Sequence, residues 1–90
     1  MEELEKYRSQ IDKIDEQIAH LFEQRMEVIS KIAELKAKLN LNTFDPNRET
    51  SMITKNREYI SKDELKQYYE IILKCFLDVS KQYQKELKSK

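Results

Sequence analysis

The stretch "IDKIDEQIAHLFEQRMEVISKIAELK" (Ile11–Lys36) decides the fold, because apolar residues recur in it with a heptad period. Continued in both directions, the repeat makes two rows of seam positions. The first row is Leu4, Ile11, Ile18, Arg25, Ile32 and Leu39, and the second is Tyr7, Ile14, Leu21, Val28 and Leu35. This pattern predicts one helix from about Glu3 to about Leu39, roughly 55 Å long at about 1.5 Å per residue. A chain of 90 residues cannot cover such a helix alone, so its seam requires a second long helix.

Arg25 is the one charged residue in this apolar seam. Its guanidinium cannot lose its proton, so a buried Arg25 requires an anion from the protein or from a ligand. The alternative interpretation is a polar residue that only sets the register of a coiled coil.

A second helix should begin inside "NLNTFDPNRE" (Asn40–Glu49). Asp45 is suited to cap free amides and Pro46 to the first helical position, which predicts a helix from Pro46 to about Tyr59. Arg48 lies in the first turn, where the helix dipole favours acids over cations. Arg48 is therefore expected to have an anionic partner, either Glu49 or a ligand.

A third helix follows "SKDE" (Ser61–Glu64), which has the pattern of a capping box with Ser61 as the N-cap. This helix is predicted from about Lys62 to about Lys85, and the fold class is therefore all-α, with three helices. The predicted apolar stripe comprises Leu65, Tyr68, Ile72, Cys75, Phe76, Val79 and Tyr83. Cys75 is expected to be buried in the core.

Composition excludes several classes of function. Seventeen basic and seventeen acidic residues balance, which argues against a nucleic-acid or polybasic membrane partner. Without glycine, phosphate-cradling and dinucleotide-binding loops are excluded. Cys75 and His20 are the only residues of their types, so neither an internal disulfide nor a Cys/His metal site is expected. The polar start "MEELEKYRSQ" and the lack of a long apolar run predict a cytoplasmic protein without a membrane span.

Three cations of the first helix have a suggestive spacing. Arg25 and Lys36 are 11 residues apart, about 16 Å along a helix, so their long side chains could converge on one small ligand. Arg8 is 28 residues from Lys36, about 42 Å, and could join them only from a second, antiparallel chain. Each flanking charge taken alone is more simply a solvated surface residue.

Two polar residues, Ser80 and Gln84, share an otherwise apolar face of the third helix, four positions apart. A hydroxyl and an amide on an inward face can be purely structural, or they can contact a ligand. No nucleophile with an adjacent base is evident anywhere in the chain.

Together these motifs resemble the all-helical class of chorismate mutases. The pattern R-x-x-I-D-x-I-D begins at Arg8, D-x-x-R-E begins at Asp45, and S-x-x-x-Q begins at Ser80. The residues that match the family's site are Arg8, Arg25, Lys36, Asp45, Arg48, Glu49, Ser80 and Gln84. The resemblance covers almost the whole chain and implies a single domain over residues 1–90.

The resemblance implies an intertwined homodimer with antiparallel first helices and two equivalent sites. Arg8 would then enter the partner's site, and the two-fold axis would cross the helix near Ala19 or His20. His20 itself lies outside the seam rows and is expected at the surface or in an interface.

The resemblance also implies the reaction, a [3,3] rearrangement of chorismate to prephenate that requires neither metal nor cofactor. Arg25 and the second chain's Arg8 would bind the two carboxylates, because a guanidinium pairs with a carboxylate bidentately. Lys36 and Gln84 would donate to the ether oxygen as it becomes negative. Glu49 would accept from the ring hydroxyl, beside Asp45 and Arg48, while Ser80 would contact a carboxylate.

Two alternatives remain at this point. A lyase that removes pyruvate from isochorismate could use the same scaffold and the same cations. A helical dimerisation module without catalysis would explain the heptads, but not Arg25 or the inward-facing Ser80 and Gln84.

Overall fold

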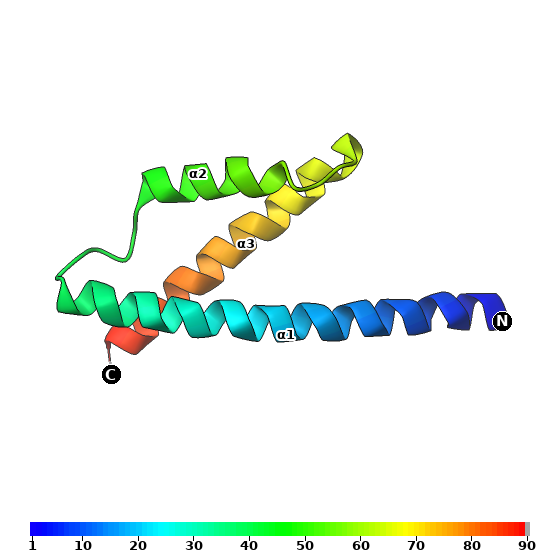
Figure 1. The fold of residues 1–90 in the computed structure, drawn as a ribbon, viewed down its shortest axis with the longest axis horizontal. Coiled ribbons are helices and arrows are strands. Elements are labelled where there is room, and N and C mark those ends of the chain that lie inside the picture. Colours follow the sequence, from blue (N-terminus) through cyan, green and yellow to red (C-terminus); the bar gives the residue numbers. More distant parts are fainter. Residues whose placement is uncertain (90) are drawn as a thin grey trace.

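The computed structural model describes residues 1–89 and contains three helices, α1 (Glu2–Lys38), α2 (Pro46–Arg57) and α3 (Asp63–Lys88). The predicted all-α fold is confirmed, and the predicted ends agree to within one to three residues. Figure 1 shows α1 as one long rod, with α2 above its C-terminal half and α3 returning diagonally from the end of α2 to the end of α1. Helix α3 packs against both of the other helices.

The end of α1 is a Schellman-type turn. The Leu41 amide donates to the Lys36 carbonyl at 2.8 Å, and the Asn40 amide donates to the Ala37 carbonyl at 3.3 Å. Asn40 adopts the left-handed conformation that this turn requires, with φ of 57°. Asparagine tolerates that conformation better than most residues other than glycine, of which the chain has none. The turn directs the following loop back toward Lys36.

Helix α2 begins as predicted. The Asp45 carboxylate accepts from the Arg48 backbone amide at 3.1 Å, and Pro46 occupies the first turn. The predicted capping box of α3 is wrong, because the N-cap is Lys62 and no side chain caps the helix. Lys66 instead joins the two helices, with Nζ at 3.2 Å from both Glu58 and Asp63.

The core of a single chain is very small. Its buried apolar side chains are Met52 of α2 and Leu73 of α3, and two polar residues, Ser80 and Gln84, are buried beside them. The face of α3 that packs inward is therefore Leu73, Ser80 and Gln84, with Phe76 and Leu77 half-buried. A polar pair at the centre of so small a core indicates a site rather than packing alone.

The expected burial of Cys75 is wrong, because this cysteine is exposed. Leu65, Tyr68, Ile72 and Val79 of the predicted stripe are also exposed in the single chain. Apolar residues cover a broad arc of α3, and α1 and α2 pack on only part of it. Sequence periodicity identified the arc but not the part that the other helices cover.

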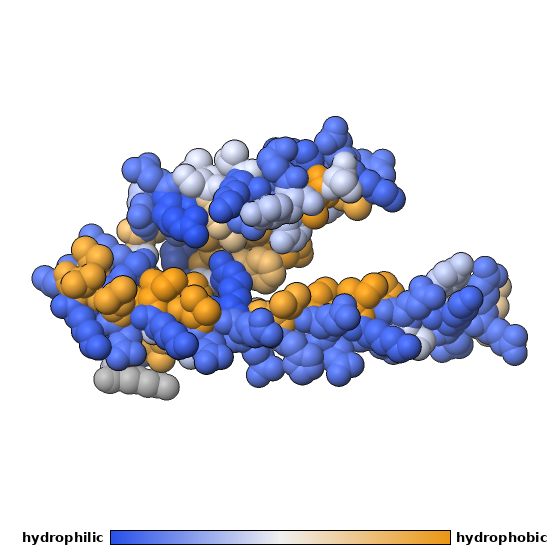
Figure 2. Space-filling model, in the orientation of Figure 1, coloured by the Kyte–Doolittle hydropathy of each residue, from blue (hydrophilic) through white to orange (hydrophobic). Residues whose placement is uncertain are grey.

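The seam of α1 is exposed along its length. Ile11, Ile18, Leu21 and Val28 each expose more than half of their surface, and α1 contains no buried residue. Figure 2 shows apolar side chains along the edge of α1 that extends beyond α3. The radius of gyration is 16.5 Å, against about 12 Å for a compact domain of this length. His20 is exposed at the surface of α1, as expected.

None of the helices within residues 1–89 is long and apolar enough to cross a membrane.

The Asp45 cap can be tested by a matched pair of substitutions. Asp45→Ala removes the side-chain acceptor and should lower the free energy of unfolding by about 1 kcal/mol, whereas Asp45→Asn retains an acceptor and should change it little. Urea unfolding followed by circular dichroism, at one fixed protein concentration, measures both. An equal loss of unfolding free energy in the two variants would show that the charge of Asp45, and not its capping hydrogen bond, stabilises the fold.

Candidate functional site

A cavity of about 230 Å³ lies between the three helices. Seven of the eight predicted site residues line it. These are Arg25, Lys36, Asp45, Arg48, Glu49, Ser80 and Gln84. Ile29, Met52 and Leu77 supply apolar wall between them. Side chains from α1, α2 and α3 therefore converge on one cavity.

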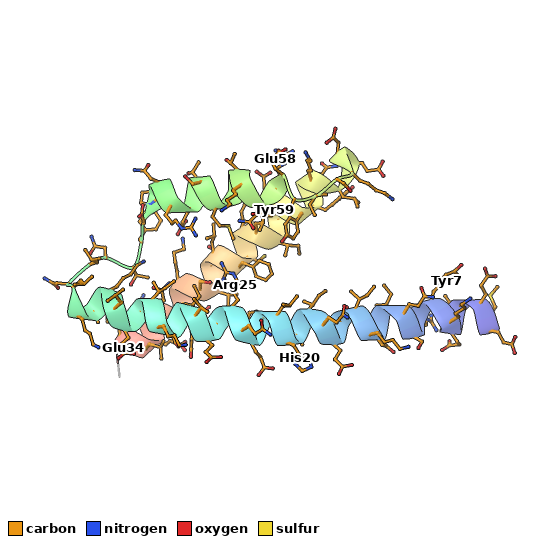
Figure 3. All side chains as sticks on the ribbon, viewed as in Figure 1. Tyr7, His20, Arg25, Glu34, Glu58 and Tyr59 are labelled. Atoms are coloured by element: carbon orange, nitrogen blue, oxygen red, sulfur yellow. The ribbon has the colours of Figure 1, made fainter. Side chains whose placement is uncertain are left out.

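Arg25 lies where α1 crosses α3 (Figure 3). Its guanidinium donates to the Ser80 hydroxyl and stacks over the Phe76 ring, with its central carbon 5.3 Å from the ring centroid. The Ser80 hydroxyl in turn donates to the Phe76 carbonyl at 2.7 Å. Ser80 thus fixes the guanidinium from the α3 side.

Burial lowers the pKa of Arg25, and the nearby charge of Arg48 lowers it further, while Tyr69 has a smaller opposing effect. Both causes destabilise the cation relative to water, yet an arginine remains protonated under all ordinary conditions. Within the described residues, no carboxylate forms an ion pair with Arg25. An anion in the cavity would relieve this cost.

Lys36 lies in the last turn of α1, half-buried in the cavity wall. Its ammonium donates to the Thr43 carbonyl at 3.1 Å. The turn at Asn40 brings that carbonyl back to the helix, so the loop orients Lys36. An ammonium has three donors, and this bond uses one of them.

Gln84 is buried, with 7% of its surface exposed, and it lies on the inner face of α3. Its Oε1 has no hydrogen-bond partner among the described residues. A buried unpaired amide oxygen is costly, and such groups occur where a ligand or water completes the site. Gln84 therefore has an unsatisfied acceptor, and its side chain lines the cavity.

Arg8 does not reach the cavity of its own chain. It is exposed on the N-terminal part of α1 and forms an ion pair with Glu5 at 3.0 Å. This position agrees with the spacing argument, which requires a second chain to bring Arg8 to a site.

Lys81 is a cavity residue that sequence reasoning missed. Its ammonium lies 3.3 Å from Oε1 and 3.2 Å from Oε2 of Glu49. The partner of Glu49 is therefore Lys81, and not the Arg48 that the sequence offered as its neighbour. The available signal was a lysine directly after Ser80, at the edge of the buried face of α3.

The Thr43 carbonyl, which accepts from Lys36, was also missed, because a main-chain acceptor leaves no sequence signal.

The charges of the cavity do not balance. Four cations (Arg25, Lys36, Arg48 and Lys81) and two carboxylates (Asp45 and Glu49) line it, which leaves an excess of two positive charges. Such a site is complementary to a small dianion. Within residues 1–89, no group of three or more His, Cys, Asp or Glu side chains could hold a metal ion.

Several curated proteins are similar in sequence to part of this chain. A bifunctional chorismate mutase/prephenate dehydratase of Aquifex aeolicus is 42% identical over 55 residues, which is 61% of this chain and 15% of the relative. A T-protein of Haemophilus influenzae is 35% identical over 57 residues, 63% of this chain and 15% of the relative. A T-protein of Enterobacter agglomerans is 34% identical over 56 residues, which is 62% of this chain and 15% of the relative.

The matched region thus accounts for 15% of the length of each of these relatives. No solved structure matches the chain significantly. The family model "Chorismate mutase type II" matches residues 7–85, which include every residue that lines the cavity. On this match, the chain belongs to the type II chorismate mutase family.

Proposed function

We propose that this chain catalyses the rearrangement of chorismate to prephenate, a step of aromatic amino-acid biosynthesis. The observation that carries the proposal is the part-buried, cation-rich cavity around Arg25 and Lys36, in a chain of this family. Chorismate is a dianion, and the cavity has an excess of two positive charges. The reaction proceeds within one molecule, so the protein has to hold one conformer and stabilise the charge that develops.

Arg25 binds one substrate carboxylate in this proposal. Ser80 and Phe76 fix the guanidinium before substrate arrives, so little side-chain entropy is lost on binding. The guanidinium fork can then pair bidentately with the carboxylate, and Ser80 lies beside the same group. The bound carboxylate also supplies the counter-charge that Arg25 lacks within its own chain.

Lys36 and Gln84 act on the ether oxygen of the substrate. Negative charge grows on that oxygen in the transition state, so a donor there contributes more to the transition state than to the ground state. The Thr43 carbonyl holds Lys36 in place and leaves two of its protons for the substrate. Gln84 donates through its amide at any pH, whereas a glutamate would have to be protonated first.

Glu49 accepts from the ring hydroxyl, next to the start of α2. Asp45 holds that helix start through its cap, and Arg48 contributes charge from the same turn. The three residues therefore shape the corner of the cavity at the start of α2, as the family resemblance implies.

The active form is a homodimer in this proposal. Support comes from the exposed seam of α1, from the extended shape, and from a core of only two buried apolar side chains. An antiparallel second α1 covers the seam and brings its Arg8 to the second carboxylate. Residues 1–90 form a single domain, and the site of action is the cytoplasm.

Lys36→Ala tests the catalytic assignment. The loss of a donor to the developing charge should lower kcat by about 100- to 1000-fold, while the helical content stays unchanged. Lys38→Ala is the matched control, because this exposed lysine of the same turn pairs with Glu34 and does not line the cavity. Chorismate consumption with identification of prephenate measures turnover.

Unchanged turnover in Lys36→Ala would contradict the assignment. Product analysis with isochorismate as the substrate separates the mutase from a pyruvate lyase, which would release pyruvate and salicylate. Folded wild-type protein that acts on neither substrate would support a dimerisation module without catalysis.

Mixing two inactive variants tests the shared site. Arg8→Ala and Arg25→Ala each damage both sites of a homodimer, whereas a hybrid dimer has one intact site and one site with both arginines lost. Random exchange makes half of the dimers hybrids, so activity should return to about one quarter of the wild-type value. Steady-state turnover before and after subunit exchange measures the recovered activity, and mass spectrometry confirms that hybrid dimers have formed. Confirmed exchange without recovery would place each site within one chain.

A further inference from the structure

Lys81 has three separate interactions at the mouth of the cavity. Its ammonium contacts both oxygens of Glu49, at 3.3 and 3.2 Å, and lies 4.9 Å from the centroid of the Phe44 ring. A third, longer contact joins it to Asp78 at 3.9 Å. These contacts connect α3 with α2 and with the loop before α2, and they hold the ammonium against the cavity wall.

The negative charge of Glu49 is unfavourable in a site that binds a dianion. Its side chain is 20% exposed and lines the same cavity as Arg25, Lys36 and Arg48. A free carboxylate in this position would pair with those cations in place of a substrate carboxylate. It would also repel the substrate, because the cavity screens charges less than bulk water does.

We propose that Lys81 is a positioning residue of this site, which holds Glu49 and neutralises it so that the other cations stay available to the substrate. This role rests on the function proposed above. Lys81 contacts both carboxylate oxygens of Glu49 while its ammonium lies over the Phe44 ring, so Glu49 is held by a cation that is itself fixed in place. Glu49 then accepts from the neutral ring hydroxyl and does not compete with the carboxylates.

The proposal predicts suppression of one substitution by another. Lys81→Met keeps most of the length of the side chain but frees Glu49, so KM for chorismate should rise about tenfold, with a smaller change in kcat. Glu49→Gln in the same chain removes the competing charge and restores the original charge excess. KM of the double variant should therefore return to within about threefold of the wild-type value, because the amide oxygen introduced by Glu49→Gln can still accept from the ring hydroxyl.

Two controls separate this role from a structural one. Lys81→Arg keeps the cation and should rescue KM, while Lys74→Met alters an exposed lysine two turns earlier on α3 and should leave KM unchanged. Thermal unfolding of each variant reports on stability. If Lys81 only ties α2 to α3, Glu49→Gln alone should raise KM as much as Lys81→Met does, because either change breaks the same ion pair.

The possible outcomes are distinct. Recovery of KM in the double variant supports the proposal. A tenfold effect of Lys81→Met that persists in the Glu49→Gln background would show direct substrate contact by Lys81 and overturn it. A wild-type protein without turnover of chorismate would overturn the proposed function, and the role of Lys81 with it, whereas an active wild type without suppression would overturn the role of Lys81 alone.

Discussion

The interaction on which the site depends is the placement of the Arg25 guanidinium against α3, between the Ser80 hydroxyl and the Phe76 ring. A hydroxyl and a ring orient a cation but do not neutralise it. Position 25 would otherwise be one more apolar contact in the seam of α1. With arginine at this position, the seam contains a cavity with an excess of positive charge. The facing part of α3 has to be polar, because an apolar face could not hold a guanidinium.

The second constraint is the length of α1 relative to the rest of the chain. Helix α3 packs against the C-terminal half of α1 only, and the apolar seam of α1 is exposed along its length. A domain with two buried apolar side chains has little hydrophobic stabilisation of its own. In the proposed homodimer, the long helix that supplies Arg25 and Lys36 also supplies the seam that the second chain covers. Under that proposal, the contact that covers the seam also brings Arg8 of the second chain to the site.

The loops and helix ends arrange the remaining charges. The left-handed turn at Asn40 returns the chain so that the Thr43 carbonyl holds Lys36, and the Asp45 cap starts α2 directly after it. Helix α2 then presents Glu49 to the cavity, where Lys81 of α3 pairs with it. Each carboxylate near the cavity is engaged by a local partner, which leaves cations as the groups available to a ligand.

The sequence by itself determined the three helices and named most of the charged and polar residues that line the cavity. The heptad rows specified α1, and Asp45-Pro46 specified the start of α2, because periodicity and capping are local properties of the chain. Family spacing named seven residues that the structure brings to one cavity. Only the tertiary structure decided which part of the apolar arc of α3 is buried, and it left Cys75 exposed. It alone paired Lys81 with Glu49 and Lys36 with the Thr43 carbonyl, because these contacts depend on how the helices cross and on where a loop places its backbone.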